Sequence, residues 1–210
     1  AMSAMTTTWD FYKNVFGHDG LDGQGTSIFA QVLSTAYVNA DDAQWSVGGA
    51  GVYLGAGSYP ANPGGHLSMT DLDIVAHELT HGVTSPNWSQ YWVDSAGYEE
   101  AGIDEATSDF FAQMVKAYTT RPAGADTAIP ATGADWEIGA GVNRGTPLRW
   151  MDQPDKDQRS VDGWHDGIAY MDGHYSSGPM NRALYFLSQG ASSAQGDVHY
   201  SPFLPGGMTG

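Results

Sequence analysis

His77-Glu78-Leu79-Thr80-His81 lies in the stretch that decides the fold of this chain, residues 71–109. Two histidines four positions apart on a helix project from the same face, so both rings can bind one metal ion. Zinc takes imidazole nitrogens at about 2.0–2.1 Å, and a catalytic zinc keeps three protein ligands and a water. Glu78 follows the first histidine and can reach that water as a general base. A metal-bound water beside a carboxylate is suited to hydrolysing a peptide bond.

The sequence around this motif predicts a helix. Apolar residues recur at helical spacing from Leu72 through Val75 and Leu79 to Val83, and residues 70 and 71 can cap its start. Pro86 indicates an end near residues 83–85. The alternative is that the two histidines are ordinary polar residues on a half-buried helix.

A second helix is predicted around Gly102-Ile103-Asp104-Glu105-Ala106-Thr107-Ser108-Asp109. Ile103, Ala106, Phe110 and Met114 give the spacing of a buried stripe. Glu105 and Asp109 share one face of that helix. Glu105 can be the third zinc ligand, and Asp109 can accept the other ring N–H of a zinc histidine. Alternatively, both carboxylates lie on a solvated face.

Together, residues 74–84 and 102–109 resemble the thermolysin-like, or gluzincin, metallopeptidases, in which the HExxH helix is followed by a Glu-x-x-x-Asp helix. The resemblance runs from about Thr6 to Gly190 and is closest to the pseudolysin and vibriolysin branch. It implies an α+β fold. A lobe with a mixed sheet over the zinc helix (residues 1–85) is followed by a mainly helical lobe (residues 86–210), with a cleft between them. It also implies a secreted zinc endopeptidase.

The amino-acid composition limits the classes of partner that this chain is expected to bind. The 210 residues include 24 acidic and 8 basic ones, a net charge of −16 at pH 7. Such a chain repels nucleic acid and anionic membranes, so neither is an expected partner. No apolar run approaches the ~20 residues of a membrane span, and no signal peptide is recognised. Cysteine is absent, so no disulfide framework exists.

Outside residues 71–109, the sequence predicts a short helix over residues 6–16 that ends at Gly17, and strands over residues 28–38 and 47–54. Residues 117–145 are rich in glycine, alanine and threonine and read as a surface loop. A last helix is predicted from Ser177 to Gly190, with Pro179 in its first turn. Its expected buried stripe is Met180, Ala183, Leu184 and Leu187.

The resemblance also assigns substrate-binding residues. Asn39 and Ala40 match an Asn-Ala pair that binds substrate backbone on an edge strand, which an extended peptide can join by main-chain hydrogen bonds. Residues 41–44 look like an insertion, which leaves the register of Trp45 open. Asn39 can instead simply turn the chain. Arg149 matches an arginine below the primed-side pocket; the alternative is a surface ion pair.

Residues 172–183, Asp-Gly-His-Tyr-Ser-Ser-Gly-Pro-Met-Asn-Arg-Ala, resemble the segment of this branch that carries an oxyanion-stabilising histidine. His174 matches that catalytic histidine. Asp172, two residues earlier, can fix its tautomer. Tyr98 is the candidate for the family tyrosine that helps to stabilise the oxyanion.

Calcium is where the chain departs from the family pattern. Asp73, Asp135 and Glu137 match calcium ligands, but the expected glutamate positions after Glu105 hold Gln113 and Lys116. Calcium needs 6–8 oxygen ligands. We therefore expect one degenerate calcium site at most, and favour a salt-bridge cluster centred on the lysine. The alternative is a lysine that points to solvent.

The expected partners are a peptide or protein substrate and, by resemblance, a propeptide. Against the family the chain looks truncated at both ends, so the missing terminal segments are further candidates. The rival function is a zinc-binding fragment or interaction module without turnover.

Overall fold

A computed structural model describes residues 1–34, 38–46, 51–88 and 99–210. The chain divides into two compact units. One comprises residues 1–93 and 111–148, and the other residues 94–110 and 149–210. The mixed α+β class is confirmed, whereas a domain boundary at residue 85 stays a prediction. Among the described residues, no helix is both long and apolar enough to span a bilayer.

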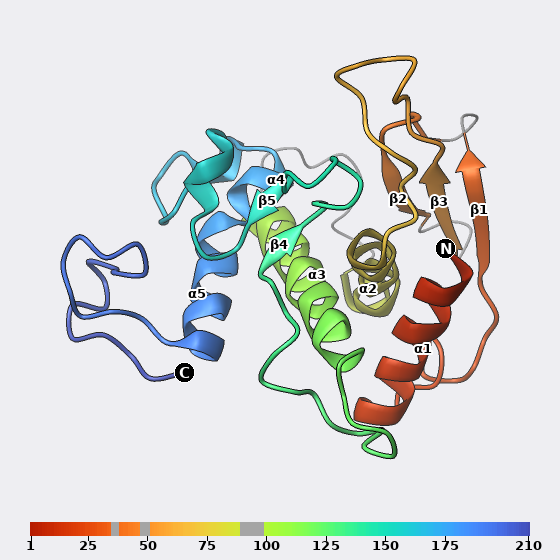
Figure 1. Ribbon diagram of the computed structural model, residues 1–210, viewed down its shortest axis with the longest axis horizontal. Helices are drawn as coiled ribbons and strands as arrows, with labels where there is room; N and C mark the ends of the chain where they lie inside the picture. Colours follow the sequence, from red (N-terminus) through yellow and green to blue (C-terminus); the bar gives the residue numbers. More distant parts are fainter. Residues whose placement is uncertain (35–37, 47–50, 89–98) are drawn as a thin grey trace. The chain divides into compact units, whose positions relative to one another are not determined.

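The sheet of the first unit has three strands, β1 (Phe29–Ser34), β2 (Ala43–Ser46) and β3 (Gly51–Gly55). Their order is β1-β3-β2, with β1 parallel and β2 antiparallel to β3, so the predicted mixed sheet is present (Figure 1). Within the described residues, the predicted strand over 28–38 appears as β1 and the one over 47–54 as β3, which extends to Gly55; residues 35–37 and 47–50 lie outside the described part. β2 was missed, because four residues after a turn are too few for alternation to show.

Helix α1 (Met2–Phe16) begins before the predicted residue 6 and ends as predicted at Gly17, whose φ of 68° is left-handed. The buried hydroxyl of Tyr12 lies 2.8 Å from Thr80 Oγ1. Thr80 Oγ1 donates to Ala76 O, so Tyr12 is the donor of the first bond. Burial raises the pKa of Tyr12, which keeps this hydroxyl protonated. The bond therefore ties α1 to the next helix.

Helix α2 (Leu72–Trp88) carries the two histidines and packs against α1, β2 and β3. Val75 and Leu79 are buried in a cluster with sheet residues Val52 and Leu54, as the stripe predicted. The predicted end at residues 83–85 is wrong. Pro86 removes one backbone donor and disfavours a helix at the preceding residue, but here the helix continues through it.

Helix α3 (Glu99–Tyr118) places Ala112, Val115 and Tyr118 in the core of the first unit. Over its earlier turns the predicted apolar stripe is wrong at Ile103, which is 43% exposed. Glu105 and Asp109 are buried instead. Charged side chains are buried when they have charged or hydrogen-bonding partners, and Arg149 supplies one here. The alternative of a solvated acidic face is excluded.

The predicted loop over residues 117–145 is largely turn and irregular structure, but α3 extends into it to Tyr118 and the short strand β4 (Glu137–Ile138) interrupts it.

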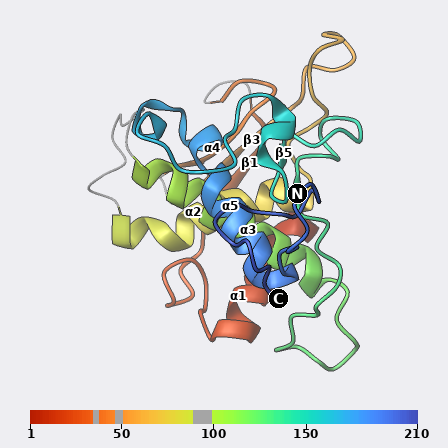
Figure 2. The ribbon, with the colours of Figure 1, turned by 90° about the vertical axis from the view of Figure 1, so that its left-hand side faces the viewer.

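The second unit contains β5 (Arg149–Trp150), two 3₁₀ turns, η1 (Pro154–Asp157) and η2 (Ile168–Tyr170), and helices α4 (Gly173–Ser176) and α5 (Gly178–Gln189). Gly102 on α3 has no room for a side chain, since a Cβ there would lie 2.8 Å from Ser176 O. This close approach positions α4. Residues 191–210 form only isolated bridges and turns after α5 (dark blue, Figures 1 and 2).

The buried face of α5 differs from the prediction. Met180 and Leu187 are 38% and 66% exposed, and Ala183 is exposed as well. The buried residues are Gly178, Asn181 and Phe186. A polar residue takes a central position because it hydrogen-bonds a buried carboxylate of α3, which helical spacing alone does not reveal.

Candidate metal centre

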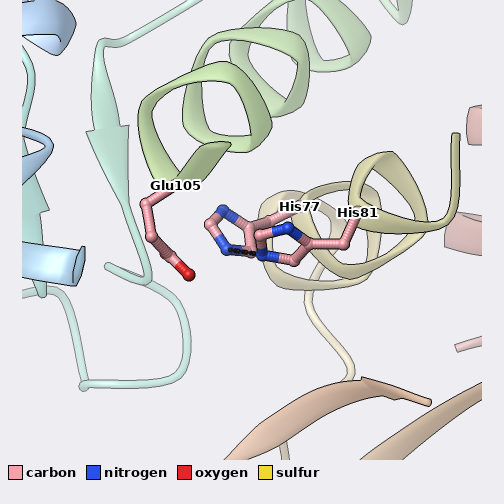
Figure 3. A group of neighbouring side chains, drawn as sticks. All are labelled: His77, His81 and Glu105. Carbon is pink, nitrogen blue, oxygen red and sulfur yellow. Dashed lines mark hydrogen bonds between the residues drawn. The ribbon is translucent and has the colours of Figure 1, made fainter. Parts of the chain in front are cut away.

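Three side chains can hold a metal ion. His77 and His81 lie one turn apart on α2, with their Nε2 atoms 3.0 Å from each other. Glu105 comes from α3, and one ligand atom from each of the three lies within 4.8 Å of the others. Figure 3 shows the two rings and the carboxylate directed toward one another. The structure therefore groups the three residues that the sequence selects as zinc ligands.

The donor set fits zinc. Two imidazoles and one carboxylate are the ligands of a catalytic zinc that leaves a fourth position open. With Zn–N bonds of about 2.0–2.1 Å, tetrahedral geometry separates two ligand atoms by about 3.3 Å. The observed 3.0 Å between the histidine nitrogens is close to this value, so the two imidazoles need only small adjustments to share one zinc ion.

Glu78, the residue after the first histidine, is buried beside the group. Its Oε2 accepts the backbone N–H of Trp45 at 2.7 Å. Trp45 lies in β2, opposite Val52 of β3. The sequence left the register of Trp45 open. In the structure, the pairing with β3 and the hydrogen bond to Glu78 fix this register.

Asp109 is fully buried, and Arg149 binds it through two bonds: Nε to Oδ2 at 2.8 Å and Nη2 to Oδ1 at 2.6 Å. The same Nη2 lies 3.9 Å from Glu105 Oε2. The alternative for Arg149 was an ion pair on the protein surface. A bidentate pair with a buried carboxylate contradicts that alternative. A bond from a zinc histidine to Asp109 stays a prediction, as does a contact between Arg149 and substrate.

Asn181 is a site residue that the sequence analysis missed. Its Nδ2 donates to Asp109 Oδ2 at 2.9 Å from a nearly fully buried position on α5. The available signal was an asparagine among the apolar residues of a predicted helix. Its partner lies 72 positions away in the sequence, however, and no local pattern identifies it.

His174 is held by Asp172, as expected. The Asp172 carboxylate accepts the backbone N–H of His174 at 2.9 Å and lies 2.8 Å from its Nδ1. The other ring nitrogen, Nε2, is 3.4 Å from Glu105 Oε2. Ser177 precedes α5 but makes no side-chain cap; its hydroxyl donates to His174 O at 2.7 Å instead. These contacts hold the imidazole at the third candidate ligand.

The remaining predicted site residues are Asn39, Ala40 and Tyr98. Asn39 and Ala40 lie in the connection between β1 and β2, so their placement on an edge strand is wrong; the edge strands of this sheet are β1 and β2. Tyr98 lies outside the described residues, so its role stays a prediction.

Lys116 does not point to solvent. Its Nζ lies 2.5 and 2.6 Å from the two Asp135 oxygens and 3.9 Å from Asp73 Oδ2. The Lys116 ammonium also donates to the backbone carbonyl of Glu137, at 3.4 Å. Gln113 Nε2 donates to the same carbonyl at 2.7 Å. Burial raises the pKa of Asp73, and the nearby lysine opposes that rise.

The group of His77, His81 and Glu105, with Glu78 directly after the first histidine, has the ligand set of a zinc centre. Two family models match the chain: "Thermolysin metallopeptidase, catalytic domain" over residues 1–85 and "Thermolysin metallopeptidase, alpha-helical domain" over residues 97–201. The chain belongs to the thermolysin family of metallopeptidases.

Similar proteins agree with this assignment. The chain is 38% identical over 200 residues to the transglutaminase-activating metalloprotease of Streptomyces mobaraensis, covering 92% of this chain and 23% of that protein. It is 30% identical over 210 residues to bacillolysin of Bacillus caldolyticus, covering 94% and 32%. The precursor of protealysin from Serratia proteamaculans shares the fold, with a TM-score of 0.63, 23% identity, and coverage of 89% of this chain and 57% of that one. The chain thus spans 23% of the length of the Streptomyces protein and 32% of the length of bacillolysin.

Proposed function

We propose that this chain is a secreted, zinc-dependent endopeptidase. The observation that carries the proposal is the group of His77, His81 and Glu105, whose ligand atoms lie within 4.8 Å of one another. Glu78 is buried next to the first ligand, in a family named for its metallopeptidase activity.

Bound zinc would supply Lewis acidity to the attacking water and to the scissile carbonyl. Glu78 is the general base: it takes a proton from the water as the water oxygen bonds to the carbonyl carbon. The same carboxyl then gives that proton to the leaving amine as the C–N bond breaks. The Trp45 N–H engages only one Glu78 oxygen. This bond fixes the carboxylate at one oxygen, and we assign proton transfer to the other.

His174 donates to the carbonyl oxygen as negative charge develops there, and Tyr98 assists. Asp172 accepts from Nδ1, so an Nε2 that also donates requires the ring to carry both protons. Arg149, Asn39 and Ala40 contact the substrate backbone, and Asp109 orients a zinc histidine. The edge of β2 offers main-chain groups to an extended peptide.

The proposed peptidase activity also indicates which partners the protein binds. We infer a peptide or protein substrate, and a propeptide as a second partner, because the structural neighbour is the precursor of a metalloproteinase. Secretion rests on the family resemblance. With a net charge of −16, neither nucleic acid nor an anionic membrane is proposed.

Zinc removal tests the proposal. Purified protein is assayed for zinc content and for cleavage of an internally quenched peptide, before and after treatment with a zinc chelator and again after zinc is restored. We expect turnover to disappear with the metal and to return with it. Zinc binding without turnover would support the interaction module instead, and failure to bind zinc would refute the assigned site.

Replacing His174 by alanine should lower kcat by about 10²–10³-fold, the usual effect of losing one oxyanion donor. Zinc content and KM should change little, because the proposed contact forms as the reaction proceeds. Steady-state kinetics combined with metal analysis measures both. Equal losses of zinc and activity would make His174 a structural residue or a ligand.

A further inference from the structure

Asp41 is the centre of a polar anchor that shares no residue with the candidate metal group. Its Oδ1 accepts the backbone N–H groups of Ser58, at 2.6 Å, and His66, at 2.9 Å. Its Oδ2 accepts the Ser58 hydroxyl at 2.5 Å. One carboxylate in the connection between β1 and β2 thereby binds both ends of the loop over residues 58–66.

The pKa of Asp41 is lowered, first by the Ser58 hydroxyl and also by the N–H groups of His66 and Ser58. A carboxyl whose pKa falls on folding stabilises the fold above its unfolded value, and this contribution is lost as the pH drops through the folded value. The ordinary value is 3.8, so the anchor is ionised and fully formed at neutral pH.

The backbone around Asp41 fits closely against the end of β3. Gly57 N donates to Ala40 O at 2.7 Å, and Gly55 N donates to Asp42 O at 2.9 Å. A Cβ at Gly55 would lie 2.6 Å from Asp42 O, so only glycine permits this approach. The hydrogen bonds to Ala40 O and Asp42 O therefore fix the backbone on either side of Asp41, just before β2 begins.

β2 begins directly after this anchored connection and ends at Ser46. It pairs on one side with β3, and its only bond to α2 through a main-chain donor among those described is Trp45 N–H to Glu78. Successive residues of a strand direct their N–H groups to opposite edges, so a slip of one residue would turn the Trp45 N–H away from Glu78. A four-residue strand has few contacts that resist such a slip.

We propose that Asp41 is a positioning residue for catalysis: it fixes the start of β2 in the register at which the Trp45 N–H meets the Glu78 carboxylate. The inference rests on the proposed role of Glu78 as the base. It also gives a role to residues 41–44, which look like an insertion against the family pattern. The simpler alternative is that Asp41 only fastens the loop over residues 58–66.

Asp41→Ala and Asp41→Asn separate these two roles, with Asp42→Asn as the matched control. Asp42 is an exposed neighbouring carboxylate whose side chain, within the described part of the chain, accepts only the N–H of the next residue. The readouts on zinc-loaded protein are residue-resolved amide hydrogen exchange, zinc content, kcat and KM. Ser58→Ala, which keeps the carboxylate, serves as a milder variant if Asp41→Ala does not fold.

We expect both Asp41 variants to speed exchange of the Trp45 amide by about tenfold, equivalent to losing one ordinary hydrogen bond. kcat should fall in parallel with unchanged zinc content, while the control stays within about twofold of wild type. Faster exchange at Ser58 and His66, with the Trp45 amide unaffected, would overturn the proposal. Because hydrogen exchange needs no turnover, an inactive wild type would refute the proposed function and still leave this test decisive.

Discussion

Replacing Glu78 by glutamine should nearly abolish peptide hydrolysis while leaving zinc bound. Glutamine has the size of glutamate and can still accept the Trp45 N–H, but it cannot take a proton from water. General-base catalysis contributes about 10²–10⁴-fold to a rate, and kcat should fall toward the upper end of this range. Steady-state hydrolysis of a quenched peptide, with zinc measured on the same sample, gives both numbers.

Two further variants serve as controls for the Glu78→Gln measurement. His77→Ala should lose zinc and activity together, since it removes a proposed ligand. Glu100→Gln changes an exposed glutamate on α3 and should leave both unchanged. Near-normal turnover by the Glu78→Gln protein would contradict the assignment of the base, whatever its zinc content.

Replacing Lys116 by glutamate should make the stability of the first unit depend on calcium. Lys116 neutralises Asp135 and faces Asp73, which is almost completely buried. The substitution removes that charge and adds a third carboxylate. Asp135 is half exposed, so the main cost is that of leaving the buried Asp73 without its cation, about 1–3 kcal/mol, or roughly 5 °C in the thermal midpoint of a chain of this size. Added calcium should recover much of the loss, because hard oxygen ligands are what it binds.

The wild-type protein is the first control: its thermal midpoints with calcium and with a calcium-selective chelator should nearly coincide. Lys116→Met is the second, since it removes the charge without adding a ligand. That variant should be destabilised in both conditions. Stabilisation of the wild type by several degrees at micromolar calcium would refute the lysine-centred cluster.

The parts of the site that sequence predicted are those encoded locally. His77 and His81 are related by one helical turn, and so are Glu105 and Asp109, so spacing alone puts each pair on one face. Lys116 was placed by resemblance, because its position normally holds a calcium ligand. In each case the relevant neighbour is nearby in the sequence or defined by the family.

The missed features depend on distant partners. The inward face of α5 follows from the bond between Asn181 and Asp109, and the burial of Asp109 depends on Arg149, 40 positions later. β2 is too short for its pattern to be visible, and its position depends on contacts of Asp41 with residues 17 and 25 positions away. Helical periodicity contains no information about such pairings.

The ammonium of Lys116 has a thermodynamic consequence of its own. A dissociable ion stabilises a fold by an amount that grows with the logarithm of its free concentration. A cation attached to the chain by a covalent stem has no such term, since dilution, dialysis and chelation leave it in place. We therefore expect the contribution of this cluster to folding to be the same in a calcium-poor fluid as in a calcium-rich one.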